Sequence, residues 1–248
     1  MSAEVSLLED WHIHSTFSDD AVSSIDENIV AAEARGLRRL RLTDHVRAST
    51  AWVPEFAAAV RRARGTTEVD VRSGVEAKIL DARGTLDAPP DLLLGEGGVD
   101  DVVIADHQFP GVDGPWSPRR TRELLASTLR ASDAIDLLVQ ATIGAMRLAD
   151  GRGQLAHPFS ILPKVGLDES QVTDEHLRAW AQAARKTGTR IEVNEKWACP
   201  SPRAIAAAMA AGATVVASSD SHDAASVGHY VRVRDLLAAA RDLTGDAG

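Results

Sequence analysis

Short runs of β-branched and aliphatic residues alternate with Ala-, Leu- and Arg-rich helical stretches along the chain. This alternation predicts repeated strand–helix units, which assemble into a parallel sheet covered by helices. We expect seven strands, at residues 7–14, 37–43, 69–79, 99–105, 154–156, 190–194 and 214–218. Seven such units within 248 residues fit one closed or nearly closed barrel better than two domains. Residues 1–248 are therefore predicted to form a single α/β barrel domain.

Local signals agree with this pattern. Ser24 followed by Glu27 fits a capping box before a helix at 28–35. The pairs Ser117-Pro118 and Ser201-Pro202 each place a capping residue before a proline at the first helical position. A doubly wound open sheet is the structural alternative, but the first strand is not followed by G-x-G-x-x-G, and the chain has no G-x-x-x-x-G-K-[ST] motif. Residues 81–98, rich in Gly, Pro and Asp, are expected to form a surface excursion.

Charge and composition narrow the class of partner. The chain has 27 basic and 36 acidic residues, a net charge of −9, which argues against a surface that coats nucleic acid. A single cysteine, Cys199, excludes an intramolecular disulfide framework and a cysteine-cluster zinc site. Aromatic residues make up 4%, so we expect a core of Ala, Val, Leu and Ile.

The same residues predict a cytoplasmic protein with no membrane partner. Residues 1–10 contain acidic side chains and no Lys or Arg, unlike a signal peptide. The longest weakly polar run, 204–217, is too short to span a bilayer. The oligomeric state is not predicted.

Histidines gather at or just past the predicted strand ends. Of the eight in the chain, those in such places are His12, His14, His45, His107, His157 and His222. The carboxyl ends of parallel barrel strands form one face, where active sites are built. His12 and His14 are two apart on a strand, so both rings point to the same side. This pattern predicts a shared metal site.

Carboxylates accompany these histidines. Glu76 lies within the third predicted strand, and Asp220 follows the last one, which a closed barrel brings next to the first strand. Asp19 or Asp20, in the loop after His14, would complete the set. The alternative is that Glu76 pairs with Lys78, which is two residues away and faces the same side.

The type of ligand indicates the type of metal. Mixed histidine and carboxylate ligands suit zinc, manganese or iron better than calcium or magnesium alone. The candidates are too many for one tetrahedral site and suffice for two or three divalent metals, with Glu76 free to bridge. Paired metals can share a hydroxide and clamp a phosphoryl group.

These residues resemble the PHP (polymerase and histidinol phosphatase) superfamily, and within it the stand-alone histidinol-phosphatase-like proteins. The resemblance runs in order through the segments DWHIHSTFSDD (10–20), LTDH (42–45), GVE (74–76), AHP (156–158), EVN (192–194) and SDSH (219–222). It implies a distorted (β/α)7 barrel with its metal site at the C-terminal ends of the strands. It also implies a metal-dependent hydrolase of small phosphate monoesters, acting through a metal-bridging hydroxide.

The resemblance also implies roles for the ligands. A first metal would be held by His12, His14, Glu76 and Asp220, and Glu76 would bridge to a second metal held by His107 and His157. A third would be held by Asp20, His45 and His222, with Asp20 preferred over Asp19. Glu76, Asp220 and His222 are the expected catalytic residues.

Other side chains are candidates for substrate contact. Lys78, Lys164 and Lys196 could each meet a phosphate as a point charge. Trp197 could form a wall of the pocket. Where family members often have Ser-x-His, this chain has Ala105-Asp106-His107, so Asp106 is expected to reshape the substrate side of the pocket or to act as general acid. The alternative functions are a nuclease or C–N bond hydrolase on the same site, and a non-catalytic metal-stabilised regulatory barrel.

Overall fold

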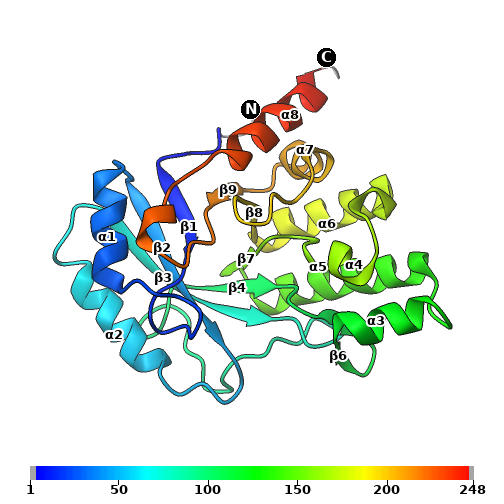
Figure 1. Ribbon diagram of the computed structural model, residues 1–248, viewed down its shortest axis with the longest axis horizontal. Helices are drawn as coiled ribbons and strands as arrows, with labels where there is room; N and C mark the ends of the chain where they lie inside the picture. Colours follow the sequence, from blue (N-terminus) through cyan, green and yellow to red (C-terminus); the bar gives the residue numbers. More distant parts are fainter. Residues whose placement is uncertain (1–3, 246–248) are drawn as a thin grey trace.

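A parallel sheet of seven strands forms the centre of the protein. The computed structural model describes residues 4–245. In spatial order the strands are β1 (Glu9–Ile13), β2 (Arg39–Val46), β3 (Asp70–Lys78), β4 (Asp101–Ala105), β7 (Gly153–Leu155), β8 (Arg190–Asn194) and β9 (Val215–Ser218) (Figure 1). All seven predicted strands are present, each overlapping its expected range.

The sheet curls until its first and last strands meet. Beyond the end of β9, Ser221 forms a parallel bridge with Ile13 of β1, and the His14 N–H donates to the Ser221 carbonyl at 2.8 Å. The result is a nearly closed, distorted (β/α)7 barrel, as predicted. This closure brings residues 10–14 beside residues 218–222.

Helices cover the outside of the barrel. Figure 1 shows α1 and α2 on one side, α3 to α6 on the opposite side, and α7 and α8 beside β8 and β9. Their bounds are α1 (Ile25–Ala34), α2 (Val53–Ala63), α3 (Pro118–Leu125), α4 (Ala131–Leu148), α5 (Ile161–Val165), α6 (Asp174–Thr187), α7 (Pro202–Ala211) and α8 (Arg232–Gly245). Two short 3₁₀ helices complete the set, η1 (Glu169–Gln171) and η2 (Ala224–Ser226).

The predicted capping residues are confirmed, although α1 begins at Ile25 and not at residue 28. Ser24 and Glu27 form a reciprocal capping box at the start of α1. The side chains of Ser117 and Ser201 accept backbone N–H groups at the starts of α3 and α7, each with proline in the first turn. The chain between β3 and β4, including the expected excursion at 81–98, has no helix; it contains only isolated bridges such as Ile79 with Leu86.

One small element was not predicted. After β4, the strands β5 (Phe109–Gly111) and β6 (Gly114–Trp116) form an antiparallel hairpin. The rings of Phe109 and Trp116 stack within it, with centroids 5.8 Å apart. Strands of three residues carry too little periodicity to be recognised from sequence.

The expected aliphatic core lies between the strands and the helices, where residues such as Leu40, Leu42 and Val75 are fully buried. The interior of the barrel is different, because much of it is polar. Arg41 is completely buried there and donates to the Trp11 carbonyl at 2.7 Å. A floor of hydrogen-bonded polar groups therefore lies beneath the histidines. Within residues 4–245, no helix combines the length and apolar character needed to cross a lipid bilayer.

Candidate metal centre

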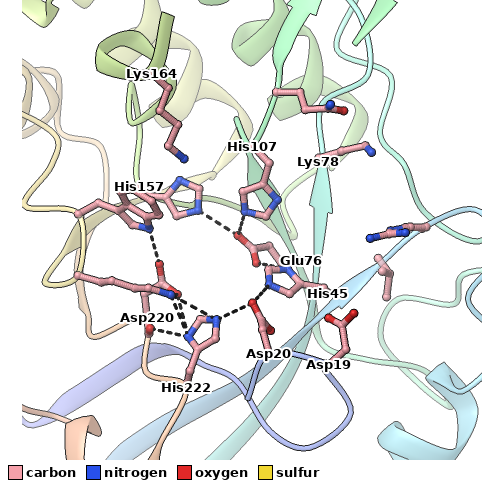
Figure 2. A pocket seen from close by; sticks show the side chains of 15 residues that line it. Asp19, Asp20, His45, Glu76, Lys78, His107, His157, Lys164, Asp220 and His222 are labelled. Carbon is pink, nitrogen blue, oxygen red and sulfur yellow. Dashed lines mark hydrogen bonds and ion pairs between the residues drawn. The ribbon is translucent and has the colours of Figure 1, made fainter. Parts of the chain in front are cut away.

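A cavity of about 610 Å³ opens at the carboxyl ends of the barrel strands. Figure 2 shows histidines and carboxylates from different strands converging on it. Its lining includes Asp19, Asp20, His45, Glu76, Lys78, His107, His157, Lys164, Lys196, Trp197, Asp220 and His222. The structure therefore brings most of the predicted site residues into one place. His12 and His14 lie directly beneath, fully buried.

The Glu76 carboxylate, on β3, lies at the middle of this cluster. Its Oε1 atom is 3.1 Å from Nε2 of both His107 and His157. Its Oε2 atom is 3.6 Å from Nε2 of His12 and 3.5 Å from Nε2 of His14. His45 Nδ1 is closer to the same oxygen, at 2.7 Å. Oε1 thus faces the pair His107 and His157, and Oε2 faces the pair His12 and His14 together with His45. Two carboxylate oxygens that face different imidazoles are the arrangement that a bridging ligand requires.

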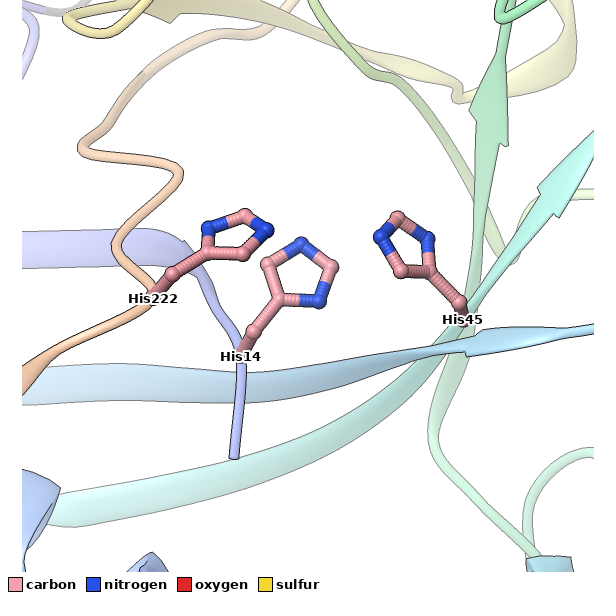
Figure 3. Close-up of side chains that lie close together, drawn as sticks. All are labelled: His14, His45 and His222. Carbon is pink, nitrogen blue, oxygen red and sulfur yellow. The ribbon is translucent and has the colours of Figure 1, made fainter. Parts of the chain in front are cut away.

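A third group of donors lies at the outer edge. Asp20 Oδ2 is 3.4 Å from His45 Nε2 and 3.2 Å from His222 Nε2. The rings of His45 and His222 flank that of His14, with centroids 4.4 Å and 4.2 Å from it, as Figure 3 shows. Asp19 also lines the cavity, but among the described residues only Asp20 reaches these two histidines.

Buried acceptors fix how two of the histidine rings face. His12 Nδ1 is 3.0 Å from Glu192 Oε2, and His14 Nδ1 is 3.3 Å from Ser18 Oγ. When Nδ1 carries the proton for these bonds, Nε2 is left with its lone pair toward the cavity. The two Nε2 atoms are 3.0 Å apart. Facing lone pairs at that distance need a cation or a proton between them.

A second observation supports a metal. Glu76 Oε2 is buried and has no hydrogen-bond partner within the described residues, although His45 Nδ1 lies 2.7 Å from it. Burial of a carboxylate oxygen without a hydrogen-bond donor is costly unless a cation binds it. Zinc, manganese and iron all accept such imidazole and carboxylate donors. The residues present therefore fit a transition-metal centre.

Glu192, on β8, is a functional residue that the sequence reasoning missed. Besides its contact with His12, it accepts hydrogen bonds from Gln154 Nε2 at 2.7 Å, from the His157 backbone N–H at 2.9 Å and from Asn194 Nδ2 at 2.5 Å. The segment EVN (192–194) is part of the family resemblance, but that resemblance alone does not assign a role to Glu192. The available signal was the alternation of Glu192 with the apolar Ile191 and Val193, which directs Glu192 to the opposite face of the strand.

Asp106 lies behind His157 and is almost fully buried. Its Oδ1 atom is 3.3 Å from His157 Nδ1 and accepts the Ser160 hydroxyl at 2.8 Å. Asp106 is not among the residues that line the cavity, so the expectation that it shapes the substrate side is wrong. Its action as general acid stays a prediction. Its carboxylate is engaged in orienting His157, as buried partners of metal-binding histidines commonly are.

The ion pairs within the cluster shift its pKa values strongly. Burial raises the pKa of the Glu76 carboxyl, but the positive charges of His107 and His12 outweigh burial and hold it well below its usual range. Burial lowers the pKa of His157, yet hydrogen bonds to Asp106 and Glu76 raise it to about 10. Such opposed shifts among neighbouring groups are characteristic of functional sites.

The pKa values of His12 and His14 are shifted in opposite directions. Burial, with the neighbouring positive charge of His12, lowers the pKa of His14 to about 3. Burial also opposes the charge on His12, but the carboxylates of Glu192 and Glu76 raise its pKa well above the usual value. In the absence of metal, a proton on His12 is therefore shared with a neutral His14.

Two ligand candidates have strained backbones. Asp220 has φ +55° and His157 has φ +29°, both in the left-handed region that residues with a Cβ seldom adopt. Such conformations are retained where the surrounding structure enforces them, often at active sites. They indicate that the fold holds these two side chains in specific positions.

The alternative pairing of Glu76 with Lys78 is not observed. Lys78 Nζ lies 3.3 Å from Asp87 Oδ2 instead. Lys196 Nζ is 3.7 Å from Asp220 Oδ1. Lys164 lines the cavity with its ammonium over the Trp197 ring. All three predicted lysines thus lie at the cavity, and none of them neutralises Glu76.

The structure is thus a nearly closed (β/α)7 barrel with a histidine–carboxylate cluster at the carboxyl ends of its strands. The PHP domain model matches residues 10–196, and the chain belongs to the PHP domain family.

Relatives and a solved structure extend this result. The chain is 30% identical over 232 residues to a probable phosphatase of Shewanella oneidensis, covering 92% of this chain and 81% of that protein. It is 28% identical over 246 residues to a probable phosphatase of Citrobacter koseri, covering 92% and 84%. It superposes with a TM-score of 0.62 and 15% identity on the histidinol phosphate phosphatase of Lactococcus lactis, complexed with zinc, L-histidinol and phosphate. That alignment covers 94% of this chain and 93% of the Lactococcus protein, so the two share a fold.

Proposed function

We propose that this protein is a metal-dependent phosphatase that hydrolyses small phosphate monoesters. The observation that carries the proposal is that the two oxygens of Glu76 face different histidines. Oε1 faces His107 and His157, whereas Oε2 faces His12, His14 and His45. One carboxylate placed in this way can bridge two metal ions. The phosphatase names of the relatives support the reaction class.

The donors divide into three groups, and the first two of these share Glu76. We propose a first metal position at His12, His14, Glu76 and Asp220, a second at Glu76, His107 and His157, and a third at Asp20, His45 and His222. Bound zinc, manganese or iron would supply Lewis acidity toward phosphate and a water of lowered pKa. In this scheme Glu76, Asp220 and His222 are the catalytic residues, since they hold the reacting groups in place.

The lysines provide the remaining positive charge. Lys164 reaches the cavity from α5 and Lys196 from the loop after β8, and each is proposed to neutralise a phosphate oxygen. Lys78 lines the opposite side, but it shares its charge with Asp87 and is proposed as a weaker contact. A small phosphorylated molecule suits a cavity of about 610 Å³.

A phosphate-release screen tests the proposal. The protein is stripped with a chelator and reloaded separately with Mn²⁺, Zn²⁺ or Fe²⁺, and each sample is assayed on a panel of monoesters that includes histidinol phosphate. We expect release from at least one monoester, two or three metal ions per chain by elemental analysis, and no release after chelation. Release that persists in chelator would overturn the metal dependence.

The same panel separates the alternatives. A phosphodiester and single-stranded DNA test for a nuclease, and a small amide tests for a C–N bond hydrolase. Protein that carries its metals but cleaves no substrate of any class would instead favour the regulatory barrel. The cytoplasmic location and the lack of a nucleic-acid partner remain predictions from the sequence, tested by cell fractionation and by DNA binding.

A further inference from the structure

Trp197 is unusual among the large apolar side chains because it is 42% exposed and yet forms a hydrogen bond with a residue of the candidate metal centre. It follows β8 and lines the cavity beside His157, with ring centroids 6.1 Å apart. Its indole Nε1–H donates to Asp220 Oδ2 at 3.0 Å. Its backbone N–H donates to Asn194 Oδ1 at 2.8 Å. One bond therefore holds the indole ring and the other holds the backbone of this residue, despite its exposure.

The bond to Trp197 gives the two oxygens of Asp220 separate roles. Oδ2 accepts from Trp197 and, at 3.3 Å, from Asn194 Nδ2. Oδ1 faces the histidines, 3.5 Å from His14 Nε2 and 3.6 Å from His222 Nδ1. Since Oδ2 is occupied by two N–H donors, Oδ1 is the oxygen directed at the cluster.

The face of the Trp197 ring lies against the ammonium group of Lys164. Lys164 Nζ lies 4.0 Å from the Trp197 ring centroid, within the range of a cation–π interaction. Among the described residues, no carboxylate lies within 4.0 Å of this ammonium. Its charge is therefore held at the cavity without being neutralised. Figure 2 shows Lys164 reaching into the cavity on the side of His157.

We infer that Trp197 is a positioning residue with two separable actions. Its N–H fixes the Asp220 carboxylate so that Oδ1 faces the histidines, and its ring face presents the Lys164 ammonium to an anion in the cavity. The first action concerns metal affinity, and the second concerns phosphate affinity. Both actions rest on the proposed function: the first needs only its metal site, and the second also needs its phosphate chemistry.

Two substitutions separate these actions. Trp197→Phe removes the N–H but keeps an aromatic face for Lys164, and Trp197→Leu removes both. Calorimetry with Mn²⁺ alone measures metal affinity, and calorimetry with inorganic phosphate on the Mn²⁺-loaded protein measures anion affinity. Loss of an outer partner of a metal ligand typically weakens metal binding tenfold or more. We expect Trp197→Phe to weaken Mn²⁺ binding by about tenfold. It should weaken phosphate binding less than Trp197→Leu does, because an aromatic face remains for Lys164.

We expect Trp197→Leu to weaken both affinities, and Lys164→Met to weaken phosphate binding only. Trp116→Phe is the matched control, because it also removes an indole hydrogen bond to an aspartate, Asp113, in a hairpin outside the cavity lining. Circular dichroism of each metal-free variant checks the fold, which the partial exposure of Trp197 should preserve.

Mn²⁺ binding by Trp197→Phe that equals the wild type would overturn the positioning of Asp220. Equal phosphate affinity in Trp197→Phe and Trp197→Leu would overturn the presentation of Lys164. Failure of the proposed phosphatase function would show differently, as wild-type protein that binds Mn²⁺ but releases no phosphate from any ester.

Discussion

His12 Nε2 and His14 Nε2 lie 3.0 Å apart, and neither nitrogen can turn away, because Glu192 and Ser18 hold the opposite side of each ring. The pKa of His12 is raised and that of His14 is lowered to about 3. At neutral pH and without metal, one proton therefore lies between the two nitrogens. A metal ion that takes its place must expel it.

The first prediction is that metal uptake at pH 7 releases protons. His12 and His157 both have raised pKa values, about 10 for His157, so both carry protons that metal binding displaces. Calorimetry with Mn²⁺ in buffers of different ionisation enthalpy should give a binding enthalpy that varies with the buffer, equivalent to at least about one proton per chain. An enthalpy independent of buffer would contradict this protonation state.

The second prediction concerns the stability of the metal-free protein. His157 has a pKa of about 10 in the folded state, against about 6.5 for an unperturbed histidine. A raised folded-state pKa adds stability that is complete below pH 6.5 and is lost as pH rises toward 10. Thermal unfolding of chelated protein should therefore shift to lower temperature across that range.

His157→Gln should flatten this dependence, and His229→Gln, outside the cavity lining, should not. Identical pH profiles for the wild type and His157→Gln would show that His157 is not the group responsible.

The third prediction concerns Glu192, which holds the Nδ1 side of His12 and accepts three further N–H groups. Glu192→Gln removes the negative charge and replaces one carboxylate oxygen with an NH₂ group. That NH₂ group would then face N–H donors instead of acceptors. We expect Mn²⁺ binding to weaken by about 10- to 100-fold, the usual effect of losing an outer partner of a histidine ligand. Glu55→Gln, on the exposed side of α2, is the control. Unchanged affinity in Glu192→Gln would mean that His12 is oriented by other contacts.

Much of the fold could be predicted because its signals are periodic and local. The alternation of strand and helix segments gave the barrel, and capping residues such as Ser24 and Ser201 gave the helix starts. The two-residue spacing of His12 and His14 placed both rings on one face, and barrel closure placed them near Asp220. These inferences needed only the strand repeat and the order of the strands.

The contacts behind the ligands could not be predicted, because they depend on side chains that are distant in sequence. Asp106 was expected in the pocket but supports His157 from behind. Lys78 was considered as a partner of Glu76, but the excursion after β3 supplies Asp87 instead. Burial within the barrel decides such pairings, and a single sequence does not show which polar groups meet there.

The fourth prediction distinguishes the two adjacent aspartates of the first loop. Asp20 lies within 3.4 Å of both His45 and His222, and the positive charges of these histidines lower its pKa despite partial burial. Asp20→Asn should therefore reduce the metal content by about one ion per chain and lower activity. Asp19→Asn is the matched control and should retain the wild-type metal content. Elemental analysis after gel filtration measures both, and equal losses in the two variants would contradict the assignment of Asp20.

The last prediction concerns Glu76, the only side chain proposed to serve two metals. Glu76→Gln keeps the size of the side chain but removes the negative charge that faces both pairs of imidazoles. We expect turnover at saturating metal to fall by at least about 10²-fold, the scale of losing one key electrostatic element of a site.

The fold should persist in Glu76→Gln, because Gln fills the same space and the apolar packing lies between strands and helices, away from this residue. Lys78 also keeps its partner Asp87 in this variant, so the substitution does not leave this partly exposed lysine unpaired. By contrast, His107→Ala removes a ligand of the second group alone and should keep metal at the first. The measurements are steady-state kinetics, circular dichroism and metal content. Turnover close to wild type in folded, metal-loaded Glu76→Gln would show that Glu76 is structural and that the bridging assignment is wrong.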